Sequence, residues 1–147
     1  MLNIEIKHFS DLITTELYDL LQLRSEVFVV EQDCVYQDID GKDEKALHIL
    51  GYKENKLVAY TRIFKPGDYF NEVSIGRVVV KENERQHSYG YDIMNASIKA
   101  IEAHYNTSEI RISAQTYLKK FYNNLGFKEV GEEYLEDDIP HINMIKS

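Results

Sequence analysis

The segment Ile75-Gly76-Arg77-Val78-Val79-Val80 is followed by the polar run Lys81–Ser88 and then by Tyr89-Gly90-Tyr91-Asp92-Ile93-Met94. The β-branched, apolar first part predicts a strand. After Gly90, apolar side chains recur at steps of three and four residues, which predicts a helix with one buried face: Ile93, Met94, Ser97, Ile98, Ile101 and Tyr105. A helix N-terminus that follows a strand can hold a phosphate through its free N–H groups and its dipole. Many such connections bind nothing, so this stretch alone favours an ordinary connection.

The composition is that of an ordinary globular domain. The 147 residues predict a single domain over 1–147 with a sizeable core, and 44% hydrophobic with 29% charged residues fits this class. The net charge of −8 argues against a nucleic-acid partner, and equally fits a solvated acidic surface or a cationic substrate. We expect no membrane partner, because no apolar run is long enough to span a bilayer. Cys34 is the only cysteine, which suits a reducing cytoplasm.

The remaining pattern alternates strand and helix signals. Period-two alternation and turn residues predict strands at Asn3–Lys7, Ala46–Tyr52, Leu57–Phe64, Glu72–Val80, Glu109–Ala114, Phe127–Leu135 and Ile139–Ile145. Amphipathic spacing predicts further helices that end near Val30 and at Leu125, and Thr14 or Thr15 is expected to cap the first of them. Strands in a run, then helix, strand, helix and two closing strands predict an α/β (α+β) domain with a mixed sheet.

An acidic segment lies between the first helix and the second strand. Glu31–Glu44 contains six carboxylates, but its glycine precedes the third acid of Asp38-Ile39-Asp40-Gly41-Lys42-Asp43. A calcium loop needs the opposite order, so we expect no metal. The segment is either a solvated loop or an acidic rim that faces a substrate. Arg24, on the buried side of the preceding helix, either forms a salt bridge at the core edge or orients a nearby carboxylate.

Several motifs together resemble the GCN5-related N-acetyltransferase (GNAT) family. They are Val78-Val79-Val80, then Arg85 with Gly90, then Ala114-Gln115, and finally Phe121-Tyr122-Asn123-Asn124-Leu125-Gly126-Phe127. Leu23-Arg24-x-x-Val27-Phe28-Val29-Val30-Glu31-Gln32, the acidic segment, His48 and Ile139-Pro140-His141-Ile142-x-Met144 are similar to the ElaA-type group. The resemblance covers essentially the whole chain. It implies the GNAT fold, in which about four helices flank a mixed, mostly antiparallel sheet of about seven strands, splayed between the fourth and fifth.

The resemblance implies acetyl-CoA as the cofactor. The implied binding residues are Val78, Val79, Val80, Arg85, Gln86, His87, Ser88, Tyr89, Gly90, Tyr91, Gln115 and Tyr122. The chain departs from the family at two places of the phosphate loop, where Gln86 and Ser88 replace glycines. Because the phosphate donors are main-chain N–H groups, we expect weaker or altered coenzyme binding rather than its complete loss.

The resemblance also implies direct attack of an amine on the thioester in a ternary complex. Tyr122 occupies the position of the general acid that serves the leaving thiolate, and the Val80 N–H is placed to stabilise the oxyanion. Four side chains are candidates for the base: Glu31, Asp40, His48 and His141. Histidine suits proton removal near neutral pH, so the catalytic set is Tyr122, His141 and His48. The implied substrate-binding set is Arg24, Glu31, Asp38, Asp40, His48 and His141.

The predicted function is therefore acetyl transfer from acetyl-CoA to a primary amine of a small molecule or peptide. One alternative is a coenzyme-binding sensor or partner-binding module without turnover, which the altered loop favours and the retained Tyr122 opposes. A lower-ranked alternative is an acyl-homoserine-lactone synthase, which shares the fold and the early Arg-x-x-Val-Phe pattern but is usually longer and more basic at its docking surface. The exposed closing strands allow a homodimer.

Overall fold

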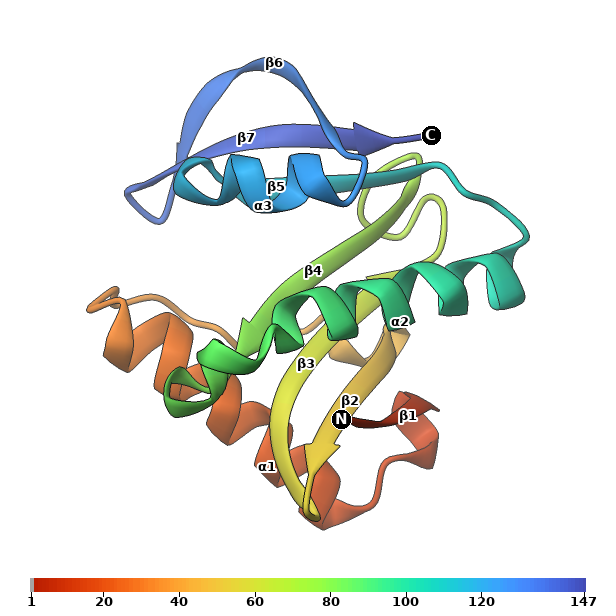
Figure 1. The fold of residues 1–147 in the computed structure, drawn as a ribbon, viewed down its shortest axis with the longest axis vertical. Coiled ribbons are helices and arrows are strands. Elements are labelled where there is room, and N and C mark those ends of the chain that lie inside the picture. The colour runs from red at the N-terminus through yellow and green to blue at the C-terminus, as the bar shows by residue number, and fades with distance from the viewer. Residues whose placement is uncertain (1) are drawn as a thin grey trace.

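A seven-stranded sheet organises the computed structural model, which describes residues 2–147 (Figure 1). The strand order is β1-β2-β3-β4-β5-β7-β6, and β4–β5 is the parallel pair in a sheet of otherwise antiparallel pairs. The strands are β1 (Asn3–His8), β2 (Leu47–Lys53), β3 (Lys56–Phe64), β4 (Val73–Val80), β5 (Ile110–Gln115), β6 (Lys128–Glu136) and β7 (Ile139–Lys146). This confirms the predicted mixed, mostly antiparallel sheet.

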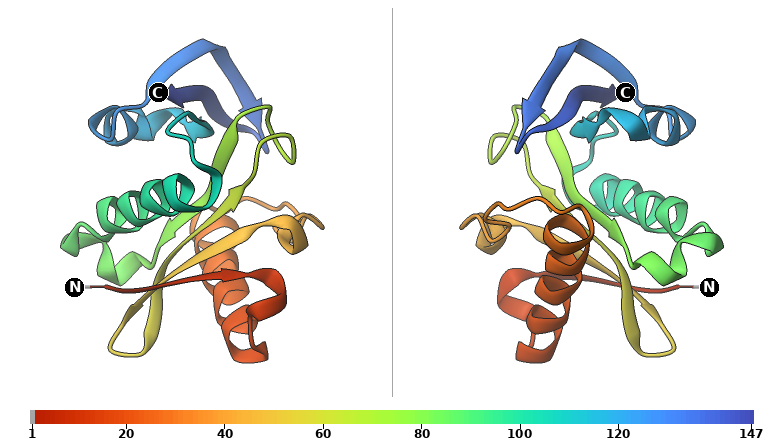
Figure 2. Two further views of the ribbon diagram at one scale, coloured as in Figure 1. Left: turned by 90° about the vertical axis from the view of Figure 1, so that its right-hand side faces the viewer. Right: turned by 90° about the vertical axis from the view of Figure 1, so that its left-hand side faces the viewer.

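Helices cover both faces of the sheet. The α-helices are α1 (Thr14–Arg24), α2 (Tyr89–Tyr105) and α3 (Lys119–Asn124). A π-helix, η2 (Ser25–Glu31), continues α1, and short 3₁₀ turns lie at η1 (Phe9–Asp11), η3 (Asp43–Lys45), η4 (Glu82–His87) and η5 (Thr116–Leu118). Figure 2 shows α1 on one face of the β2–β4 strands and α2 on the other. The sheet is therefore the middle layer of three.

The first helix begins and ends differently from the prediction. Its N-cap is Ile13, so the expected cap at Thr14 or Thr15 is wrong. The Ile13 N–H instead donates to Glu16 Oε1 at 3.0 Å, and Glu16 also accepts from Lys7 Nζ at 2.7 Å. At the other end the hydrogen bonds change to π spacing, as in Gln32 N–H to Val27 O at 3.1 Å. Single π turns inside helices are frequent at functional sites.

The splay predicted between the fourth and fifth strands is confirmed. Within residues 2–147, β4 and β5 pair only at Val73–Ile110 and Ser74–Arg111, and the strands then separate. A β-bulge follows in β4, where the register against β3 shifts and Arg77 has a left-handed φ of 50°. A bulge bends its strand and re-aims side chains. The last residues of β4 therefore line an opening between the two halves of the sheet.

Two apolar clusters hold the layers together. The larger lies between the sheet and α2, with Ile93 and Met94 of the helix fully buried. The smaller places Leu20 and Leu23 of α1 against Leu50 and Tyr60 of the sheet. Burial of these side chains fixes the start of α2 beside the end of β4.

Replacing Ile93 by Ala should lower the free energy of unfolding by about 2–4 kcal/mol, because the removed side-chain atoms leave a cavity between the sheet and α2. Ile98→Ala on the half-buried flank of α2 is the matched control and should cost roughly half as much, since less apolar area is buried there. Urea denaturation with constant m-value measures both. Equal losses in the two variants would contradict the assigned core.

Candidate active site

A cleft of about 500 Å³ lies where β4 and β5 separate. One end, which we call the helix end, is formed by Arg85, Ser88, Gly90 and Tyr91 at the start of α2. The other, the hairpin end, is formed by Ser113, Glu136, Asp137 and His141 with Tyr36 and Arg77 facing them. Val78–Val80 and Tyr122 line the passage between the two ends. The cleft thus runs through the sheet.

The helix end presents backbone amides. Ser88 has a left-handed φ of 61° and its carbonyl accepts the N–H groups of Tyr91 and Asp92 at 3.1 and 3.3 Å. This leaves the N–H groups of the first two α2 residues, Tyr89 and Gly90, without intrahelical acceptors, as at any helix start. The left-handed backbone costs Ser88 about 1–2 kcal/mol relative to glycine. Of the two glycine replacements noted in the sequence, it is Ser88 that occupies a positive-φ position.

The candidate coenzyme residues separate into two groups. Val78, Val79, Val80, Arg85, Ser88, Gly90, Tyr91, Gln115 and Tyr122 line the cleft. Gln86 and His87 lie exposed on η4, and the Tyr89 side chain is buried in the core, so these three offer at most their main chain.

The edge of β4 turns its hydrogen-bonding groups toward the cleft. The Lys81 N–H donates to Val58 O of β3 at 2.8 Å. Because these groups alternate sides along a strand, the N–H and C=O of Val80 point away from β3. Arg85 confirms this direction, since its Nε donates to Val80 O at 3.1 Å. The Val80 backbone therefore faces the cleft, and by the same alternation so does that of Val78.

Glu31 and Gln32, at the C-terminal end of the π-helix, contact residues on the other side of the cleft. Arg85 donates to both carboxylate oxygens of Glu31, at 2.5 and 2.7 Å. The side-chain amides of Gln32 and Gln115 exchange hydrogen bonds at 3.2 and 3.4 Å. The second contact joins the end of η2 to the end of β5 across the cleft. Glu31, a candidate base, is therefore engaged by a guanidinium.

Tyr122 lies in the passage with its ring fixed and 6% of its surface exposed. Phe121 and Phe127 pack edge-on against it at centroid distances of 5.0 and 6.1 Å. Burial raises the pKa of Tyr122 well above that of a free phenol. Full proton transfer from this phenol therefore costs more than the free-group pKa values suggest, and Tyr122 stays protonated as a hydrogen-bond donor.

The hairpin end brings together groups from three strands. The His141 Nδ1 lies 2.7 Å from Ile139 O; a carbonyl only accepts, so Nδ1 carries the proton. The Tyr134 ring stacks on the imidazole at 6.0 Å, and the Tyr134 hydroxyl hydrogen-bonds to Ser113. The His141 Nε2 is 3.5 Å from Glu136 Oε2. Sequence reasoning missed Glu136, because it lies at the edge of an acidic turn that gives no sign of facing a cleft.

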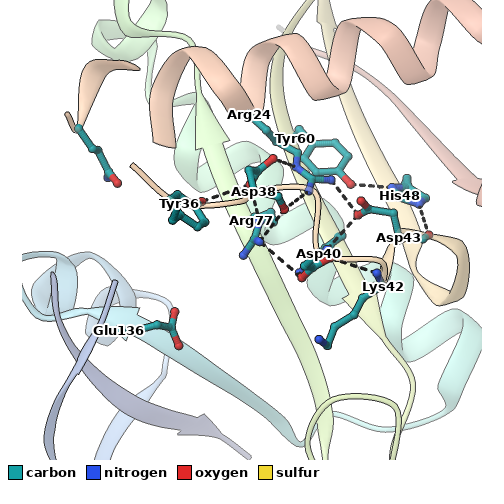
Figure 3. Close-up of polar contacts among 12 residues, drawn as sticks. Arg24, Tyr36, Asp38, Asp40, Lys42, Asp43, His48, Tyr60, Arg77 and Glu136 are labelled. Atoms are coloured by element: carbon teal, nitrogen blue, oxygen red, sulfur yellow. Dashed lines mark hydrogen bonds and ion pairs between the residues drawn. The ribbon is translucent and has the colours of Figure 1, made fainter. Parts of the chain in front are cut away.

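Three candidates from the substrate set, Arg24, Asp38 and Asp40, lie elsewhere, in an ion-pair network outside the cleft (Figure 3). Arg24 donates to Asp38 Oδ2 at 2.9 Å and to Asp43 Oδ1 at 2.8 Å. Arg62 donates to Asp43 Oδ1 at 2.9 Å and to Asp40 Oδ2 at 2.6 Å. None of these five side chains lines the cleft. Arg24 was expected either to form a salt bridge at the core edge or to orient a carboxylate. The structure shows both in one contact, because Arg24 pairs with Asp38 and Asp43 inside the fold.

His48 belongs to the same buried layer. Its Nε2 donates to Asp43 O at 2.9 Å, so its Nδ1 accepts from the Tyr60 hydroxyl at 2.6 Å. Burial lowers the pKa of His48 below its ordinary value, which favours the neutral ring. Both nitrogens are engaged and the side chain is fully buried, so His48 cannot reach a substrate in the cleft. We correct the placement of His48, Arg24, Asp38 and Asp40 in the substrate pocket accordingly.

Arg77 connects this network to the cleft. Its guanidinium lies 2.7 Å from Asp38 Oδ1, donates to Asp38 O at 2.9 Å and packs over the Tyr36 ring. These contacts hold a non-glycine residue in left-handed backbone, which costs about 1–3 kcal/mol on its own. The acidic segment thus stabilises the bulge that opens the sheet.

Two further features bear on the class of protein. Within residues 2–147 no group of three His, Cys, Asp or Glu side chains is arranged to hold a metal ion. No helix in the described chain combines the length and the apolarity needed to cross a membrane.

A splayed mixed sheet with a helix N-terminus at the mouth of the splay defines an acyl-CoA-dependent acyltransferase fold. The acetyltransferase (GNAT) domain family matches residues 14–147, and the chain belongs to this family. It is 46% identical over 141 residues to protein ElaA of Escherichia coli, with 95% of this chain and 92% of ElaA covered. Proteins of this fold use acyl-CoA.

Solved structures agree. An acyl-CoA N-acyltransferase from Pseudomonas aeruginosa superposes with a TM-score of 0.94 at 42% identity, and Escherichia coli ElaA with 0.92 at 44%, each covering 100% of both chains. The AHL synthase LasI superposes with 0.81 over 99% of this chain and 89% of its own, but at 12% identity this shows the fold alone.

Asp43→Asn should lower the free energy of unfolding by about 3–5 kcal/mol at pH 7, because it leaves Arg24 and Arg62 buried beside a neutral group. Burial alone would raise the pKa of Asp43, but the hydrogen bonds and charges of Arg24 and Arg62 hold it below its ordinary 3.8. Its contribution is therefore present above pH 3.8 and lost as the pH falls below that value. Urea denaturation at pH 7 and pH 3 measures this, and the variant should lose less than the natural protein on acidification. The exposed Asp33→Asn is the control; an equal loss there would contradict the assignment.

Proposed function

We propose that the protein is an acetyl-CoA-dependent N-acetyltransferase that acts on a primary amine of a small molecule or peptide by direct attack in a ternary complex. The observation that carries the proposal is the edge of β4 that has no strand partner among residues 2–147, where the Val80 backbone faces a cleft that begins at the α2 N-terminus. Within one cleft the chain offers donors for an anion, an edge for an amide-bearing chain, a buried phenol and an imidazole.

The residues at the helix end fit the coenzyme. The amides of Tyr89 and Gly90 and the α2 dipole favour pyrophosphate, and Arg85 adds a charged donor once it exchanges Glu31 for phosphate. The backbone of Val78 and Val80 can pair with the amides of the pantetheine arm as a strand would. Bound there, acetyl-CoA would supply an acetyl group activated as a thioester, which an amine nitrogen can attack with loss of the coenzyme thiol.

His141 is the base in this proposal. Because Nδ1–H is held by Ile139 O, the Nε2 lone pair is free to take a proton from the acceptor amine. The other candidates are less suited. Glu31 is paired with Arg85, and the pKa of Asp40, which burial alone would raise, is held far below its usual range by Arg62. The His48 side chain is fully buried and does not line the cleft.

Tyr122 and Val80 serve the other side of the reaction. The Tyr122 hydroxyl donates a hydrogen bond to the departing sulfur, and its raised pKa keeps that proton in place until it is needed. The Val80 N–H is positioned to stabilise developing negative charge on the acetyl oxygen.

Three expectations from the sequence stay predictions beside this proposal: one domain over 1–147, a cytoplasmic setting and a homodimer.

Ser88→Asp should weaken acetyl-CoA binding by more than about tenfold in calorimetry, since a carboxylate a few ångströms from the phosphates is strongly repelled. Ser88→Asn is the matched control, because Asn has the same shape as Asp without its charge and also tolerates left-handed backbone. It should bind as the natural protein does. Failure of the natural protein to bind acetyl-CoA would favour the alternative of a partner-binding module without turnover.

Tyr122→Phe should lower kcat by about 10²-fold with little change in the KM for acetyl-CoA, because it removes a proton donor and keeps the ring packing. Thiol release with the best acceptor from a panel of primary amines measures the effect. Tyr105→Phe, at the far end of α2, should retain full activity. Full turnover in the Tyr122 variant would remove the phenol from the mechanism.

A further inference from the structure

The hairpin end of the cleft carries uncompensated negative charge. Charged groups elsewhere in the cleft are paired: Glu31 with Arg85, and Arg77 with Asp38. Glu136 and Asp137 line the hairpin end from the β6–β7 turn, and the closest cationic partner of Glu136 is His141, which bears charge only when protonated. Figure 3 shows Glu136 apart from the ion-pair network, on the side of the cleft opposite Tyr36 and Arg77.

The His141 imidazole, whose side chain is buried, indicates which ligand this charge suits. His141 is 6% exposed, and its Nδ1 is occupied by Ile139 O. Within residues 2–147, Nε2 has no hydrogen-bond partner, although it lies in the cleft 3.5 Å from Glu136 Oε2. Glu136 Oε1 is in turn 3.5 Å from Ser113 Oγ. Glu136 thus lies between the His141 lone pair and the Ser113 hydroxyl, and all three groups can accept hydrogen bonds from ammonium groups.

We propose that Glu136, with Asp137 beside it, selects acceptors that carry a second positive charge, so that short α,ω-diamines are preferred to amino acids of the same length. This inference rests on the proposed function, because it names the acceptor class of the same cleft. The reacting amine lies by His141 and gives its proton to Nε2. The distal ammonium group of the diamine stays charged and lies in the negative field of Glu136 and Asp137. A carboxylate at that place is repelled by the same field.

Three probes of equal length separate charge from shape. They are 1,4-diaminobutane, butylamine and 4-aminobutanoate, which share the reacting amine and differ in the distal group. Thiol release should give kcat/KM in that order, with the diamine at least about tenfold above the amino acid, as expected for one favourable ion pair replaced by a repulsive one. Glu136→Gln should reduce this ratio at least about fivefold, mainly through the KM of the diamine.

Glu133→Gln is the control, since it removes the same charge from an exposed position on β6 outside the cleft. It should leave the ratio unchanged. A binding measurement keeps the test independent of turnover: in NMR titration of the protein saturated with coenzyme A, 1,4-diaminobutane should shift the His141 signals, and the shift should weaken in Glu136→Gln.

Each adverse result has a distinct meaning. Turnover that prefers 4-aminobutanoate, or a ratio that Glu136→Gln does not change, would overturn the inference and leave the acetyltransferase proposal standing. Absence of diamine binding to the coenzyme-saturated protein would also overturn it. Loss of acetyl-CoA binding itself would instead be seen in calorimetry of the natural protein, and that result bears on the proposed function.

Discussion

The separation of β4 from β5 after two paired residues leaves backbone groups of β4 inside a cleft without strand partners. Such groups are costly to bury unless something pairs with them, so the fold presents an edge that a ligand can complete. Arg85 satisfies one of them, the Val80 carbonyl, through its Nε. The start of α2, the phenol of Tyr122 and the imidazole of His141 all line one cleft because the sheet opens at this point.

The buried ion pairs of Arg24, Arg62 and Arg77 with the aspartates of the acidic segment keep the sheet open. Buried ion pairs contribute little net stability when compared with apolar packing, but removing one partner is expensive. Their value here is geometric, because Asp38 holds Arg77 in the left-handed conformation that makes the bulge. A loop that looks like a solvated acidic surface in the sequence is therefore a structural support of the cleft.

Local sequence patterns predicted the fold well, whereas they did not predict contacts between residues that are distant in the sequence. Period-two and period-three-to-four spacing located the strands and α2, because burial of one face acts directly on the local sequence. The role of His48 could not be predicted, since its partners Tyr60 and Asp43 are set by sheet register and loop path. Ile13 replaced Thr14 as the cap because Glu16 reaches back to its N–H. Glu136 was missed because only the splay turns it toward a cleft.

The two ends of the cleft carry opposite electrostatic character. Helix dipole and Arg85 make the helix end suited to anions, whereas Glu136 and Asp137 make the hairpin end suited to cations. An anionic donor and a cationic acceptor that enter from opposite ends do not compete for the same groups. Tyr122 lies between the two ends, with its side chain buried and its ring lining the passage. In the proposed reaction, charge would therefore order the two ligands along the cleft, and they would meet at the apolar passage of Val78–Val80.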